Sequence, residues 1–124
     1  MAYEIPGFSF TLPSGADFTS GAQFRFCDVS NTGKAVNPTA GSSMVGVRQN
    51  RPKLNEGATI IHSGISFVEA GGVVAAGDLI AADATGRALK ATTGQTVVGR
   101  ALEAASAAGI QIAVLLNPNT AAAA

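Results

Sequence analysis

Hydrophobic and polar residues alternate over short runs along most of the chain, and glycine, asparagine or proline closes most of these runs. The runs cover residues 23–29, 34–36, 43–49, 58–62, 64–69, 79–82, 87–91, 96–101 and 110–116. Alternation with a period of two is typical of strands with one buried face, and residues that tolerate positive φ mark the turns between them. Residues 100–108 favour a helix by composition, but this stretch is short and ends at Gly109, so we expect a strand followed by a loop. The pattern predicts an all-β domain.

Two parts of the chain match each other at a constant separation of 53 residues. The segment GKAV at residues 33–36 corresponds to GRAL at residues 86–89, and the Thr, Gly and Val-Gly positions that follow keep the same separation. A half built only from short strands cannot bury its apolar face alone. We therefore expect two related halves, about residues 23–57 and 78–112, that close on each other as a small, β-tulip-like β-barrel.

The first 22 residues read as an extended N-terminal arm, because prolines and glycines interrupt them. Within the arm, Phe8, Phe10 and Leu12 alternate with polar residues, which predicts a short strand with one apolar face. Such an arm either covers its own domain or reaches a neighbouring chain, and the sequence leaves both open. The predicted organisation is an arm at 1–22, a single β domain at 23–118 and an Ala-rich tail at 119–124.

Charge is scarce in this chain. Only 13% of the residues are charged, and 8 basic residues balance 8 acidic ones. This balance gives no electrostatic reason to expect nucleic acid or an anionic membrane as a partner. A small domain with so little charge has a surface rich in small residues, or buries part of it against other chains. The N-terminus lacks the pattern of a signal peptide, so we expect synthesis in the cytoplasm.

The residue types that carry chemistry do not form a recognisable constellation. His62 is the single histidine, and its neighbour Ser63 faces the opposite side of a strand. Cys27 is the single cysteine and lies in a strand-like run, where a buried apolar role is expected. Asp28 and Asp83 precede turns, where Asp commonly accepts hydrogen bonds from the local backbone. We expect no catalytic, cofactor or metal site and no small-molecule substrate.

Basic residues gather at Arg48, Arg51 and Lys53, in an expected loop that also contains Gln49 and Asn50. Two interpretations stay open for this segment, a polar contact patch and a solvated loop. No aromatic residues are interleaved for base stacking, which argues against nucleic acid.

Residues 71–117 carry a resemblance to a known family. They contain AGDLI at 76–80, an Asp-x-x-Gly turn at 83–86 and ALEA at 101–104, and they end in an apolar strand followed by asparagine. This segment resembles the C-terminal half of the capsid decoration, or cement, proteins of tailed bacteriophages, and residues 23–47 resemble the family loosely. The basic segment and the alanine tail depart from the common form. The AGDL motif also resembles β-clip modules, which leaves an accessory domain of an enzyme or of a secretion or pilus assembly system as the alternative.

The resemblance implies a structural protein on the capsid exterior of the virion. Such proteins bind the major capsid protein, bridge its neighbouring subunits, often form trimers, and commonly use extended arms for these contacts. The contact residues expected on this basis are Tyr3, Ile5, Phe8, Phe10 and Leu12 in the arm, and Arg48, Arg51 and Lys53 in the basic segment. Removal of residues 1–15 is then expected to abolish capsid binding and leave the domain folded.

Overall fold

The computed structural model describes residues 5–21 and 23–122, and these residues form strands and turns without a helix. The strands are β1 (Ile5–Pro6), β2 (Ser9–Pro13), β3 (Arg25–Val29), β4 (Ala35–Val36), β5 (Gly46–Arg48), β6 (Gly57–Ile61), β7 (Gly64–Glu69), β8 (Leu79–Ala82), β9 (Ala88–Lys90), β10 (Thr96–Ala101) and β11 (Gln111–Ala122). The predicted all-β class is confirmed. Nothing in the described part of the chain is a helix able to span a membrane.

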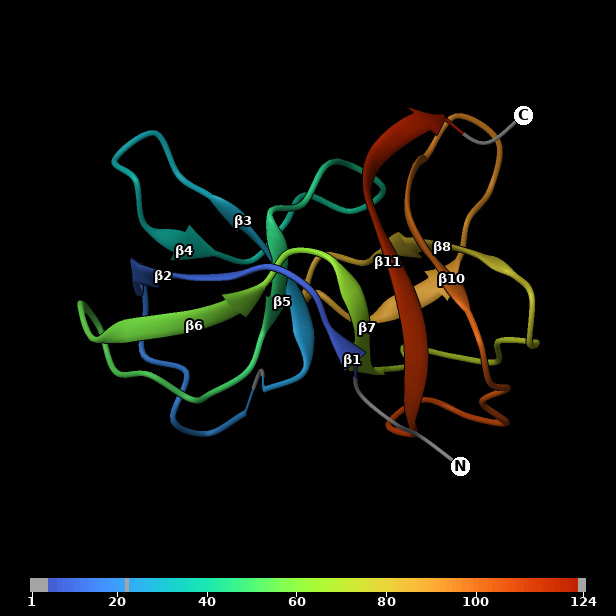
Figure 1. The fold of residues 1–124 in the computed structure, drawn as a ribbon, viewed down its shortest axis with the longest axis horizontal. Coiled ribbons are helices and arrows are strands. Elements are labelled where there is room, and N and C mark those ends of the chain that lie inside the picture. The colour runs from blue at the N-terminus through green and yellow to red at the C-terminus, as the bar shows by residue number, and fades with distance from the viewer. Residues whose placement is uncertain (1–4, 22, 123–124) are drawn as a thin grey trace.

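The strands form two antiparallel sheets with the same internal order (Figure 1). One sheet has the order β2-β6-β5-β3-β4, and the other has the order β1-β7-β11-β10-β8-β9. If β1 is set aside, each sheet contains five consecutive strands arranged in the same way. We call β2–β6 the first half and β7–β11 the second half. The structure therefore confirms the two related halves, and it adds a leading strand to each of them.

Strand register repeats with the separation seen in the sequence. Between β3 and β5, Cys27 pairs with Gly46; between β8 and β10, Ile80 pairs with Gly99. Both residues of the second pair lie 53 positions after those of the first. The β3–β4 and β8–β9 hairpins are also equivalent in register at this separation.

The two hairpin turns are built alike. Gly33 and Gly86 have φ values of 79° and 84°, a left-handed conformation that glycine adopts without steric cost. At the start of each turn, a side-chain oxygen accepts a hydrogen bond from the N–H four residues later, at 3.2 Å to Ser30 and 2.8 Å to Asp83. The sequence pattern predicted that Asp28 and Asp83 occupy equivalent positions in the two halves, but the structure shows that Ser30 is the equivalent of Asp83. Asp28 instead accepts a bond from the next N–H.

Each half curves until the strand at the end of its sheet order, β4 or β9, meets the chain that follows its leading strand, β2 or β7. Ala35 of β4 forms a parallel bridge with Ser14, which follows β2, and Ala88 of β9 forms one with Ala70, which follows β7. The next N–H along the chain then donates to the bridged alanine at 2.8 Å in both halves. These bridges give both halves a barrel-like closure from very short strands.

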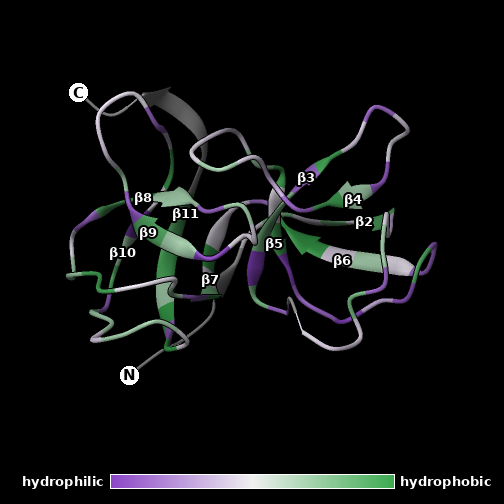
Figure 2. Cartoon of the chain, turned by 180° about the vertical axis from the view of Figure 1, so that it is seen from behind, coloured by the Kyte–Doolittle hydropathy of each residue, from purple (hydrophilic) through white to green (hydrophobic). Residues whose placement is uncertain are grey.

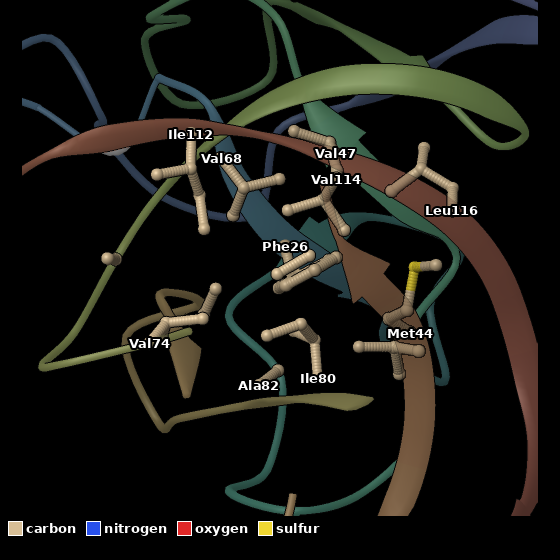
Figure 3. Close-up of a cluster of buried hydrophobic side chains, with 14 of the residues drawn as sticks. Phe26, Met44, Val47, Val68, Val74, Ile80, Ala82, Ile112, Val114 and Leu116 are labelled. Carbon is tan, nitrogen blue, oxygen red and sulfur yellow. The ribbon is translucent and has the colours of Figure 1, made fainter. Parts of the chain in front are cut away.

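Two hydrophobic clusters fill the protein, and β3 separates them. Neighbouring residues in a strand point to opposite faces, so Cys27 and Phe26 enter different clusters. Cys27 packs inside the first half together with Ala35, Ala58 and Ile60. Phe26 lies on the outer face of that half and enters the second-half core, among the labelled side chains of Val68, Ile80 and Val114 in Figure 3. The second half thus completes its core with residues of the first.

The N-terminal arm belongs to both sheets. Its β1 pairs with β7 in the six-stranded sheet, and its β2 pairs with β6 in the other. Phe10 and Leu12 pack against the cluster inside the first half, so β2 covers its own domain. At the other end of the chain, β11 continues into the Ala-rich segment as far as Ala122, which pairs with Thr96 of β10.

Candidate functional site

The arm presents an aromatic surface around Phe8. Phe8 and Phe10 are two positions apart and therefore lie on one face of the extended chain, with ring centroids 6.0 Å apart. The His62 ring lies 6.1 Å from the first ring and 6.3 Å from the second. His62 Nδ1 lies 2.8 Å from the Val45 carbonyl oxygen, which can only accept, so Nδ1 donates. The side chain of Phe8 remains 59% exposed.

Only part of the expected arm contact surface is open to a partner. Phe8 is exposed, whereas Phe10 and Leu12 are half-buried because they cover the first half. Tyr3 lies outside the described residues, and Ile5 is described by its pairing with β7 alone. Among the expected arm contacts whose side chains the structure describes, Phe8 therefore has the most surface to offer.

Arg48 lies in the sheet and not in a loop, which corrects its expected place in a surface patch. It is the last residue of β5, and its relative exposure is 0%. The guanidinium carbon lies 3.8 Å from the centre of the Phe18 ring, a cation–π arrangement that replaces some of the lost hydration. Burial lowers the pKa of Arg48. The side chain supports the fold.

Arg51 and Lys53 are exposed in the loop between β5 and β6. The Lys53 N–H donates to the Glu56 carboxylate at 2.8 Å, and the Phe18 N–H donates to the Pro52 carbonyl at 2.8 Å. The first bond closes the loop on itself, and the second holds it against the segment that follows β2.

Phe8 and the basic loop lie at opposite ends of β2. The N–H of His62, just after β6, donates to the Phe8 carbonyl, whereas the loop leads into Gly57 at the start of β6, opposite Pro13. Five strand residues span about 17 Å at the usual rise per residue. The structure therefore gives two separate surfaces where the sequence suggested one set of contact residues.

Cys27 is buried inside the first half. The pKa of its thiol is raised to about 12: burial is the main cause, the Arg48 charge opposes it, and the nearby Asp28 carboxylate adds to it. The expected role as a small buried apolar side chain is confirmed.

An ion cluster joins the two halves. Arg25 of β3 forms bonds of 3.2 and 3.1 Å to the Glu69 carboxylate of β7, and Arg87 lies 3.8 Å from Glu69 and 3.4 Å from Asp83. All four side chains are partly buried. The geometry is that of a structural junction, since each carboxylate already has a basic partner. Within the described ranges, no pocket and no group of three metal-ligating side chains occurs.

Comparison with known proteins decides what kind of protein carries these surfaces. The family model for phage cement proteins matches residues 7–116. The chain belongs to the phage cement protein family. This cement protein is therefore a structural protein associated with the phage capsid, and the family is not one of enzymes. The resemblance stated from residues 71–117 is confirmed and extends over both halves.

One solved structure supports the fold of this cement protein. The N base of head fiber gp8.5 of bacteriophage phi29 is similar with a TM-score of 0.72 and 17% sequence identity, over 92% of this chain and 98% of that chain. At this identity the likeness concerns the fold. A search of curated protein sequences gives no match.

Hydrophobic residues gather on strands of both halves, and several connecting loops are hydrophilic (Figure 2).

Proposed function

We propose that this cement protein binds the outer surface of the phage head, bridges neighbouring major capsid subunits and acts as a trimer. The match of residues 7–116 to the cement family carries the proposal. Synthesis in the host cytoplasm would precede its addition to the head. None of the findings favours an accessory domain of an enzyme or of a secretion system.

Phe8 supplies the first contact. Aromatic residues are enriched in the buried centres of interfaces, and full burial of such a side chain is worth about 1.5–3 kcal/mol. β1 and β2 hold the arm on both sides of Phe8, so binding would order little additional chain. The neighbouring ring of His62 widens the apolar surface offered to a capsid subunit.

Arg51 and Lys53 supply a second, polar contact. A bridging protein must touch two subunits, and the basic loop lies about 17 Å along β2 from Phe8. Exposed cations at the rim of an interface affect association rate and salt dependence more than affinity. We therefore assign most of the binding energy of these two sites to Phe8.

The test compares Phe8→Ser with Val29→Ser, an exposed apolar residue of β3 that is not part of the proposed contact. Co-sedimentation with expanded heads that lack the cement protein measures affinity, and light scattering measures the mass of the free protein. We expect Phe8→Ser to weaken binding about tenfold, equivalent to about 1.4 kcal/mol, and Val29→Ser to leave it unchanged. Equal binding by both variants would remove Phe8 from the contact surface, and a monomeric mass would contradict the trimer.

A point substitution is preferable to removal of residues 1–15. The truncation was expected to leave the domain folded, but β2 pairs along its whole length with β6, and Phe10 and Leu12 cover a core cluster. A truncated protein that fails to bind would therefore report loss of the fold as readily as loss of a contact.

A further inference from the structure

A row of four residues crosses the outer face of the second half, and we call it the outer stripe. Arg100 of β10 pairs directly with Leu79 of β8 on one side and with Leu115 of β11 on the other. Leu115 in turn pairs with Ile65 of β7. Directly paired residues of antiparallel strands share a face, so these side chains stand side by side. At about 4.8 Å between strands, the row is about 14 Å long.

The stripe faces away from the second-half core. Ile80 and Val114, the chain neighbours of Leu79 and Leu115, are fully buried in that core, so the leucines point outward. Leu79 is 46% exposed and Leu115 is 44% exposed. Solvent-facing positions of an antiparallel sheet are usually polar, so two exposed leucines in one row are unusual.

The repeat shows what this row does in the first half. Leu79 and Arg100 lie 53 positions after Phe26 and Val47, which pair with each other in the same way. Val47 also pairs with Ile61, which completes an equivalent row. All three side chains of that row are buried where the first half enters the second-half core. Figure 3 labels Phe26 and Val47 there. In the first half this row is thus a docking interface, whereas in the stripe the two leucines that flank Arg100 remain exposed.

Arg100 identifies the chemistry of the missing partner. Its Nε donates to the Gly77 carbonyl at 3.1 Å, and among the described residues no carboxylate forms an ion pair with it. Arg100 is exposed, so a partner that buries its guanidinium must supply a carboxylate or comparable acceptors, and a neighbour of Leu79 and Leu115 needs apolar side chains. A second copy related by a two-fold axis through Arg100 would oppose Arg100 with Arg100, which is repulsive.

The stripe also continues into the arm. Its Ile65, which lies two strands from Arg100, pairs with Ile5 of β1. The surface assigned to the arm and the outer stripe are therefore joined through β1 and β7.

We propose that the outer stripe is a further capsid-docking surface, which takes a region of the major capsid protein that presents a carboxylate between aliphatic side chains. The proposal rests on the proposed function. It places the main apolar contact of the second half on Leu79 and Leu115, and its charge contact on Arg100.

The test uses the full chain and three variants. Arg100→Glu reverses the charge, and Leu79→Ser with Leu115→Ser removes the two leucines that flank Arg100. Val73→Ser is the control, since Val73 is 74% exposed outside the stripe. Binding to expanded heads that lack the cement protein is measured at low and high salt, together with thermal unfolding and the mass of the free protein. We expect at least a tenfold loss for Arg100→Glu at low salt and for the double variant at both salt concentrations. The control should bind as the wild type does.

Each result decides the proposal. If a folded Arg100→Glu variant binds as the wild type does, the outer stripe is not a docking surface. The proposed function survives this result, because the wild-type protein still binds heads. Failure of the wild type to bind heads overturns both. A change in the mass of the free protein on substitution assigns the stripe to a second copy of the chain and also overturns the proposal. If the double variant unfolds, Arg100→Glu and the uncharged Arg100→Gln decide, because this exposed side chain is outside the core.

Discussion

Substitution of the two turn glycines by alanine tests how the halves are joined. Gly33 and Gly86 occupy equivalent turns with nearly equal φ values, 79° and 84°. A Cβ at Gly33 would meet nothing within 4 Å, whereas a Cβ at Gly86 would overlap the carbonyl oxygen of Phe26 and lie 3.2 Å from the Arg25 side chain. The Phe26 N–H also donates to the Gly86 carbonyl at 2.6 Å. The two variants therefore share the backbone strain and differ in the displacement of Phe26.

The expected difference follows from these contacts. Left-handed backbone costs an L-residue about 1–2 kcal/mol, which sets the loss of unfolding free energy for Gly33→Ala. Gly86→Ala adds the hydrogen bond of Phe26, about 1 kcal/mol, and part of the packing of this ring, whose complete loss costs about 3–5 kcal/mol. We expect Gly86→Ala to lose about 2 kcal/mol more than Gly33→Ala.

Urea denaturation followed by circular dichroism measures both values, and thermal unfolding should separate the variants by about 8 °C. Equal destabilisation of the two variants would refute the reasoning, because it would mean that the Gly86–Phe26 contact does not hold the halves together.

Three further predictions concern buried or bonded groups. Alkylating reagents should not modify Cys27 in the folded protein at pH 8 and should modify it fully in urea. Because the pKa of the thiol is raised from 9.0 to about 12 in the folded state, the stability that the neutral thiol contributes should be lost between about pH 9 and 12. The Cys27→Ala variant should not show this loss. For Asp83, burial alone would raise the pKa, but the N–H of Arg87 and the other donors of the turn lower it below 3.8, so its contribution is present above that value and lost as the pH falls. Replacement of Asp83 by serine, the residue present at Ser30, should cost about 1 kcal/mol at pH 7 and progressively less as the pH falls below 3.8, as measured by denaturation over a series of pH values. Phe18→Leu should cost about 1 kcal/mol through loss of the ring face over the guanidinium of β5, while Phe18→Tyr should be near neutral in the same assay.

Local pattern was sufficient for most strands. The structure has β7, β8 and β10 at the predicted residues 64–69, 79–82 and 96–101. Their boundaries are fixed by neighbouring glycines and by alternation, which are local properties. The repeat was also visible in the sequence, because equivalent turns need glycine at the same positions.

Long-range contacts explain what the sequence did not reveal. The burial of Arg48 depends on Phe18, 30 residues earlier in the chain, although the predicted strand at 43–49 already included this arginine. The pairing of β1 with β7 joins residues about 60 positions apart and leaves no local signal. Leu79 was missed as a surface residue because β8 is apolar on both faces. Its alignment with Phe26 in the repeat was the available clue.

The shared core also sets an order for folding. The cluster around Cys27 lies wholly within the first half, whereas the second-half core includes Phe26, Val47 and Ile61 from the first. During synthesis the first half leaves the ribosome earlier and can collapse before the second half is complete. We expect the second half to fold directly onto a surface that is already in place. The open face of its sheet, which would otherwise invite aggregation, is then covered as soon as it forms.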